Sequence, residues 1–230
     1  MSTVMITGAN RGIGLELATR YAQRGDRVLA CCRAPGDADK LKALSASNPN
    51  VTTYAVKVTD DASVASLAKD IGAQPIDILI NNAGASGAMD KQSLATMDFA
   101  GWAELFNVNS MAPVRVLQAV RANLAAANGA KAITITSQMG AIAWNNPVAY
   151  AYCASKAAVN KVMKMASVEL AKENTSVALV HPGWVRTEMG GAGADISVEE
   201  SAAGIINVID KLNMTDTGSF YKWNGETHPW

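Results

Sequence analysis

Short apolar runs and longer amphipathic stretches alternate along this chain. The short runs are rich in Val, Ile and Thr, which is typical of β-strands. The longer stretches repeat apolar residues every three or four positions, as helices packed by one face do. The pattern predicts strands at residues 3–7, 27–32, 51–58, 76–80, 131–136, 176–180 and 218–221, and helices at residues 15–22, 39–46, 61–71, 99–127, 149–170 and 197–212.

Regular alternation of strands and helices is the chain order of an α/β fold with a mainly parallel sheet. The run at residues 76–80 is almost continuously apolar, as expected of a strand buried on both faces of such a sheet. No internal repeat, charge block or linker divides the sequence. We therefore expect one domain spanning residues 1–230, with about seven strands and helices on both faces of the sheet.

Composition narrows the range of partners. Hydrophobic residues make up 49% of the chain and 20 basic side chains balance 20 acidic ones, so a sizeable core is expected and neither nucleic acid nor a membrane surface is an expected partner. A small molecule is the expected partner. No secretory signal or membrane-spanning stretch is evident, which predicts a cytoplasmic protein. Three cysteines without metal-ligand spacing predict neither a disulfide framework nor a metal site.

A glycine-rich loop follows the first predicted strand and opens the first helix. It reads Gly8-Ala9-Asn10-Arg11-Gly12-Ile13-Gly14. Glycines let the backbone approach a pyrophosphate closely, and the positive end of the following helix faces its charge. The spacing departs from the commonest dinucleotide fingerprint, so a tight connection without a ligand is an equally weighted alternative until other motifs are considered.

The end of the second predicted strand bears on the choice of cofactor. NAD-binding proteins place an acidic residue there, roughly 20 residues past the glycines, to bind the ribose 2′-hydroxyl. This chain instead has Cys31-Cys32-Arg33. A guanidinium binds phosphate in a bidentate manner, so Arg33, helped by Arg11, favours NADPH or NADP over NADH. The alternative is that Arg33 is a solvated loop residue.

Polar or small residues follow three later strands, where ligands bind in open α/β sheets. Asn81-Asn82-Ala83-Gly84 follows the apolar run at residues 76–80, Ser137 follows the strand at residues 131–136, and Pro182-Gly183 follows the strand at residues 176–180. We expect them to face one cleft together with the glycine loop. Asn109 lies inside a predicted helix, where asparagine is unfavourable unless its side chain has a task.

Tyr152 and Lys156 stand one turn apart on a predicted helix. An ordinary phenol, with a pKa near ~10, exchanges protons poorly at neutral pH, and a neighbouring ammonium lowers that pKa. The pair therefore makes a plausible acid/base catalyst. Taken alone, this spacing is common enough in helices that a chance pair on a solvated face carries more weight.

These motifs occur in one chain order: Thr7-Gly8, Gly12-Ile13-Gly14, Asn81 to Gly84, Asn109, Ser137, Tyr152-x-x-x-Lys156 and Pro182-Gly183. Their joint order resembles the short-chain dehydrogenase/reductase family. The resemblance covers essentially the whole chain, and the ending from Gly218 to Trp230 is similar to the C-factor-like, carbonyl-reductase side of the family. It implies a single Rossmann-type doubly wound domain and NADPH-dependent reduction of a ketone or aldehyde to an alcohol.

The resemblance also implies roles for matching residues. Tyr152 would be the general acid, Lys156 would lower its pKa and bind the nicotinamide ribose, Ser137 would hold the substrate oxygen, and Asn109 would position a water that links Lys156 to solvent. The residues expected to bind the cofactor are Gly8, Asn10, Arg11, Gly12, Ile13, Gly14, Arg33, Val58, Asn82, Ala83, Gly84, Tyr152, Lys156, Pro182, Gly183, Val185 and Thr187.

Several features depart from the family pattern or leave alternatives open. The interval from Ser137 to Tyr152 is longer than usual and Tyr150 occupies the usual position, but only Tyr152 has a lysine one turn on. Lys57 stands where many relatives carry an aspartate, which puts the usual adenine contact in doubt. Residues 189–196 are expected to form a lid over substrate, and a homodimer or homotetramer is expected. The alternative function is a nucleotide-binding signalling protein of the C-factor type with little turnover.

Overall fold

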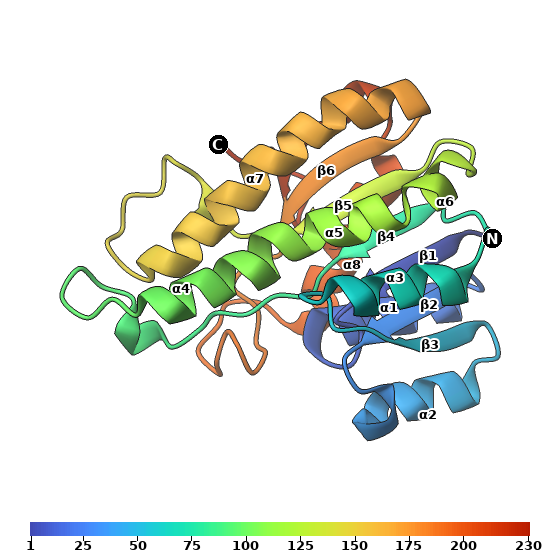
Figure 1. The fold of residues 1–230 in the computed structure, drawn as a ribbon, viewed down its shortest axis with the longest axis horizontal. Coiled ribbons are helices and arrows are strands. Elements are labelled where there is room, and N and C mark those ends of the chain that lie inside the picture. Colours follow the sequence, from blue (N-terminus) through green and yellow to red (C-terminus); the bar gives the residue numbers. More distant parts are fainter.

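Seven parallel strands form one sheet in the computed structural model, which describes residues 1–230. Their order across the sheet is β3-β2-β1-β4-β5-β6-β7, and every adjacent pair is parallel (Figure 1). The predicted fold class is confirmed, including the short strand at the sheet edge. The strands are β1 (Thr3–Thr7), β2 (Arg27–Cys32), β3 (Val51–Ala55), β4 (Ile78–Asn81), β5 (Lys131–Ile135), β6 (Ser176–His181) and β7 (Ser219–Lys222).

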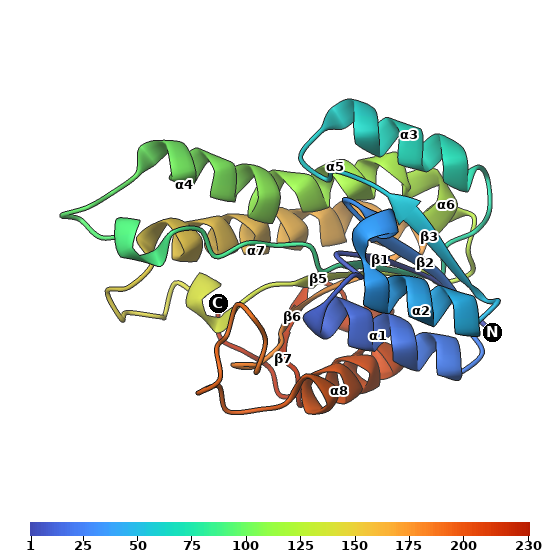
Figure 2. The same ribbon diagram turned by 90° about the horizontal axis from the view of Figure 1, so that it is seen from below.

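Helices cover both faces of the sheet. Figure 2 shows α1 (Gly12–Gln23), α2 (Asp39–Ser47) and α8 (Val198–Lys211) on one side, and α3 (Asp61–Ile71), α5 (Ala112–Ala119) and α7 (Tyr150–Leu170) on the other. The short helices α4 (Phe99–Phe106) and α6 (Arg121–Ala125) precede and follow α5. No helix has both the length and the apolar character needed to cross a membrane.

Alternating side chains of the central strands belong to two separate hydrophobic cores, one on each face of the sheet. Met5 of β1 belongs to the core under α3, α5 and α7, whereas its neighbours Val4 and Ile6 belong to the core under α1, α2 and α8. All three side chains are fully buried. Because successive strand residues point to opposite faces, burial on both sides requires the continuous apolar runs seen in the sequence.

The strand order reverses at β1, which pairs with β2 on one side and β4 on the other. The chain crosses outward from β1 through α1, α2 and α3 before returning at β4. The loops that follow β1 and β4 therefore leave the sheet side by side and in opposite directions. A crevice at this position is where ligands bind in doubly wound folds.

Two predicted elements are wrong in extent. The third strand ends at Ala55 rather than Val58, because its partner β2 ends opposite it at Cys32. The single helix expected over residues 99–127 is α4, a π-helical turn at Asn107–Met111, α5 and α6. The irregularity begins before Pro113, and the N–H of Ala112 donates to the carbonyl of Asn107.

Candidate functional site

The glycine loop after β1 is packed directly against the end of β4. The Asn82 amide donates to the backbone carbonyls of Thr7 at 3.0 Å and Gly8 at 3.1 Å. Gly14 also packs tightly against this contact, since a Cβ there would lie 2.3 Å from the Gly8 oxygen and 2.4 Å from Asn82 Nδ2. Such distances exclude any side chain at residue 14 without movement of the loop. Asn82 therefore has a structural role, because its side chain fixes the glycine loop to the end of β4.

Helix α1 begins at this loop with its first turn uncapped by any side chain. Arg11 is the N-cap residue and makes no side-chain cap hydrogen bond, and the first turn contains no acidic residue. The backbone N–H groups and the positive end of the helix dipole are thus free of a competing carboxylate. Together with the close glycine packing, this arrangement fits the pyrophosphate of a dinucleotide.

The end of β2 carries no carboxylate. Cys32 is buried, and Arg33 beside it is exposed. Val58 is buried beyond β3, whereas Lys57 is exposed. Arg11 is largely exposed and forms an ion pair with Glu188. Arg33 and Lys57 are therefore accessible cations near the end of β2.

The end of β5 and the first turns of α7 bring Ser137, Tyr152 and Lys156 together. Lys156 Nζ lies 5.8 Å from the centroid of the Tyr152 ring and donates to the backbone carbonyl of Ile135 at 3.1 Å. The Ser137 side chain lowers the pKa of the Tyr152 phenol, which places the two residues in the same group. Tyr152, rather than Tyr150, is the tyrosine that has a lysine one turn on.

Burial controls the proton affinities of this group. It raises the pKa of the Tyr152 phenol, and the Ser137 side chain opposes that rise. It also lowers the pKa of Lys156 to about 8. The expected lowering of the Tyr152 pKa by Lys156 is not found in this structure: burial raises that pKa, and Ser137 is the neighbour that opposes the rise.

Asn109 has the specific task that its place inside a helix suggested. Its side chain accepts from the N–H of Ala85 and donates to the carbonyl of the same residue, each at 2.9 Å, and it donates to Ser155 Oγ at 3.0 Å. A Cβ at Gly84 would lie 3.2 Å from Asn109 Oδ1 and 3.6 Å from Lys156 Nζ. Asn109 and Lys156 thus flank the backbone that follows β4.

A close backbone contact holds the Ser137 turn against α7, and the sequence analysis did not identify it. A Cβ at Gly140 would lie 2.7 Å from the backbone carbon of Lys156. Thr136 donates to Asn160 Oδ1 at 2.6 Å, and Asn160 donates to the Gly140 carbonyl at 3.1 Å. The only sequence signal was a small residue shortly after a strand.

The segment after β6 reaches back to the glycine loop. A Cβ at Gly12 would lie 3.4 Å from the Thr187 methyl carbon. Val185 is buried and pairs with Ile196 in an isolated parallel bridge that closes the loop around residues 189–196. Pro182 accepts from Ser201 Oγ at 2.6 Å, which fixes this segment to α8. Gly183, Asn10 and Ile13 also lie in these two segments, whereas Ala83 donates its N–H to Thr7 Oγ1 at 3.1 Å.

Trp144 and Trp184 have different surroundings. Trp184 is 50% exposed and donates from Nε1 to the carbonyl of Gly190 at 2.9 Å. Trp144 packs against the core beneath α3, α5 and α7. Trp184 therefore lies on the segment that reaches the glycine loop, and Trp144 contributes to packing.

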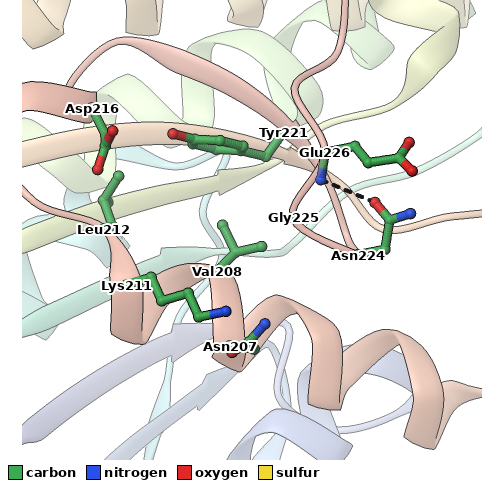
Figure 3. Close-up of a pocket in the computed structure, with 9 residues that line it drawn as sticks. All are labelled: Asn207, Val208, Lys211, Leu212, Asp216, Tyr221, Asn224, Gly225 and Glu226. Atoms are coloured by element: carbon green, nitrogen blue, oxygen red, sulfur yellow. Dashed lines mark hydrogen bonds between the residues drawn. The ribbon is translucent and has the colours of Figure 1, made fainter.

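A cavity of about 450 Å³ lies away from these residues, between α8 and the chain after β7 (Figure 3). None of its lining residues belongs to the predicted site. Lys211 and Asn207 face it from α8, and Asn224 and Glu226 face it from the turn after β7. Cavity size alone does not identify the reactive centre in this fold.

Several known proteins are similar to this chain. The sequence profile of the short chain dehydrogenase family matches residues 2–195. The C-signal protein of Myxococcus xanthus is 40% identical over 157 residues, which are 68% of this chain and 93% of that protein. A 1-hydroxy-2-glutathionyl-2-methyl-3-butene dehydrogenase of Rhodococcus is 32% identical over 237 residues, 100% of both chains. The structure of NADPH-bound carbonyl reductase from chicken fatty liver has a TM-score of 0.94 and 31% identity, covering 100% of this chain and 99% of that one.

Proposed function

This chain belongs to the short-chain dehydrogenase/reductase family and is an NAD(P)-dependent oxidoreductase, and from that premise we propose that it reduces a ketone or aldehyde to an alcohol with NADPH. The observation that carries the proposal is the grouping of Ser137, Tyr152 and Lys156 at the carboxyl ends of the strands, where the glycine loop also lies, with Lys156 Nζ 5.8 Å from the centroid of the Tyr152 ring. The similarity to an NADPH-bound carbonyl reductase supports the choice of reaction.

In this proposal Tyr152 is the general acid of carbonyl reduction and the general base of alcohol oxidation. Its raised pKa keeps the phenol protonated at neutral pH, which suits donation to the substrate oxygen. Ser137 hydrogen-bonds the same oxygen and orients it. The nicotinamide of the bound cofactor supplies the hydride.

Lys156 and Asn109 assist proton transfer by the Tyr152 phenol. With a pKa of about 8, Lys156 is protonated at neutral pH and favours negative charge on the Tyr152 oxygen as the proton leaves. It also hydrogen-bonds the nicotinamide ribose. Asn109, held by Ala85 and Ser155, positions the water that returns protons to Lys156.

Cofactor preference is a separate proposal supported by charge at the end of β2. Arg33→Ala is expected to raise the Kd for NADPH about tenfold and the Kd for NADH little, because only NADPH presents a 2′-phosphate to the guanidinium. Tryptophan-fluorescence titration with both cofactors checks this expectation. Lys57→Ala, which removes a neighbouring exposed cation, is the matched control. Equal losses for the two cofactors on removal of Arg33 would remove that residue from the 2′-phosphate role.

Two further features belong to the proposal. Residues 189–196 close over the substrate, and the bridge between Val185 and Ile196 supports this role because it anchors both ends of the loop beside the glycine loop. The protein forms a homodimer or homotetramer, for which exposed apolar side chains on α4 and α7, among them Phe99, Met165 and Val168, provide a surface.

The direct test of the function is consumption of NADPH in the presence of activated ketones and aldehydes. The proposal expects loss of absorbance at the reduced-nicotinamide band with at least one class of carbonyl. The second candidate, a signalling protein that binds the nucleotide with little turnover, is favoured by the similarity to C-signal. Saturable NADPH binding without turnover across the whole panel would support that candidate and reject the reductase.

A further inference from the structure

The catalytic helix α7 starts without a cap from its own sequence. Its N-cap residue is Ala149, whose methyl group accepts no hydrogen bond and whose backbone is left-handed, with φ of 50°. The first backbone N–H groups of a helix have no partner within the helix. In α7 these groups include the N–H of Tyr150 and the N–H of Tyr152 itself. Partners for them must come from elsewhere in the chain.

Gln92 supplies both partners. Its side-chain Oε1 accepts from the N–H of Tyr152 at 2.8 Å, and its backbone carbonyl accepts from the N–H of Tyr150 at 3.1 Å. Gln92 lies in the loop between β4 and α4, and its side chain and backbone are 4% exposed. A residue remote in sequence therefore does what Ser, Thr, Asn or Asp does at an ordinary N-cap.

The Gln92 side chain is itself held in place. Its Nε2 donates to the carbonyl of Ser86 at 2.7 Å. Ser86 follows Ala85, whose N–H and carbonyl are both bound by Asn109. An amide in this position has one orientation that satisfies both neighbours, with oxygen toward the helix and nitrogen toward the loop. Hydrogen bonds, together with the peptide link between Ala85 and Ser86, thus connect Asn109 to the backbone of Tyr152.

We propose that Gln92 is a positioning residue for Tyr152, which it serves by capping the first turn of α7 from the loop after β4. This inference rests on the proposed function, in which the Tyr152 phenol transfers the proton. The phenol is attached to the same residue whose N–H Gln92 binds, so fraying of the first turn displaces the reacting oxygen. A displacement of about 1 Å can lower a rate roughly a hundredfold.

The test compares two buried side-chain amides that hold loops at opposite ends of the strands: Gln92 in the loop after β4, and Asn123, which binds the loop before β4. Gln92→Met removes the acceptor and nearly preserves side-chain volume. Asn123→Leu is the control, because Asn123 is 6% exposed and donates to the carbonyls of Gly72 at 2.7 Å and Gln74 at 2.8 Å, before β4 begins. Both variants are expected to lower the Tm, which makes stability the matched quantity.

The expected result is a separation of kinetic constants. Gln92→Met lowers kcat about tenfold to a hundredfold, while the KM for the carbonyl and the Kd for NADPH change less than about threefold. Asn123→Leu leaves kcat within about twofold of the parent. Gln92→Glu keeps an acceptor for the Tyr152 N–H and, in its protonated form, a donor for the Ser86 carbonyl, so we expect it to recover most of the kcat lost in Gln92→Met.

Three outcomes would overturn the inference: an unchanged kcat in Gln92→Met, an equal fall of kcat in Asn123→Leu, or a Gln92→Glu variant no better than Gln92→Met. Tyr152→Phe is assayed in parallel. If that variant keeps normal turnover, the assignment of the acid to Tyr152 fails and the positioning role fails with it, whereas a parent protein without turnover on any carbonyl would reject the proposed function itself. If Tyr152→Phe is inactive while Gln92→Met is fully active, only the positioning role is rejected.

Discussion

Tyr152→Phe is expected to lower kcat for carbonyl reduction at least about a thousandfold while the Kd for NADPH stays within about twofold of the parent value. The substitution removes only the phenolic oxygen and leaves the ring that packs beside Lys156. Cofactor affinity therefore persists and proton donation is lost. Initial rates of NADPH consumption and a fluorescence titration with NADPH measure the two quantities on the same preparation.

Tyr150→Phe is the matched control for this experiment. Tyr150 is the first residue of α7, two positions from Tyr152, and it occupies the interval from Ser137 that is usual in the family. It has no lysine one turn on. We expect Tyr150→Phe to keep near-parental turnover. The opposite pair of results, an active Tyr152→Phe and an inactive Tyr150→Phe, would transfer the acid role to Tyr150.

The pKa values give the two reaction directions different requirements. A phenol with a raised pKa is protonated at neutral pH and is ready to donate in reduction. Oxidation needs the phenolate, which burial disfavours and a charged Lys156 favours. Lys156 carries that charge below about pH 8 and loses it above. In the proposed mechanism, the two residues therefore favour carbonyl reduction near neutral pH.

The fold was predictable from sequence because its signals are local and repeated. The continuous apolar run that includes Ile78 and Ile80 required a strand covered on both faces, and successive strand–helix units required a parallel sheet. Motif order then predicted a shared crevice. The structure brings Ser137, Tyr152 and Lys156 together at the carboxyl ends of the strands, as that order indicated.

The features that the sequence did not predict depend on contacts between residues distant in sequence. The end of β3 depends on where β2 stops, and Asn109, inside the π-helical turn at Asn107–Met111, bonds Ala85, which lies 24 residues earlier. Gln92 gave no signal at all, since a lone glutamine in a polar loop has no local pattern. In each case the partner is specified only by the folded chain.

The face of α7 that is buried also differs from the one the apolar pattern suggested. The apolar series Ala154, Ala158, Val162, Ala166 and Leu170 also indicates this helix, yet Val162 is 38% exposed. The buried side contains Ser155, Val159 and Met163, and it is partly polar because Ser155 bonds Asn109. Polar residues on the core side therefore weaken the periodic signal.

Gly14→Ala is expected to weaken NADPH binding at least about a hundredfold, equivalent to about 2.8 kcal/mol. The new methyl group would lie 2.3 Å from the Gly8 carbonyl oxygen and 2.4 Å from Asn82 Nδ2. Relief of that overlap requires either the glycine loop or the Asn82 amide to move. Both surfaces belong to the proposed pyrophosphate site, so affinity falls even though the substitution is far from Tyr152. Fluorescence titration with NADPH measures the loss.

Gly36→Ala separates this local effect from a general effect of adding a methyl group. Gly36 lies near the end of β2 and no heavy atom lies within 4 Å of a Cβ built there, so we expect the parental Kd. Thermal unfolding of both variants without cofactor measures the strain alone, expected at about 1–3 kcal/mol for Gly14→Ala. Near-parental NADPH affinity in a folded Gly14→Ala protein would mean that the phosphates bind away from this loop, since an enclosed pyrophosphate would be displaced by the same movement that relieves the clash.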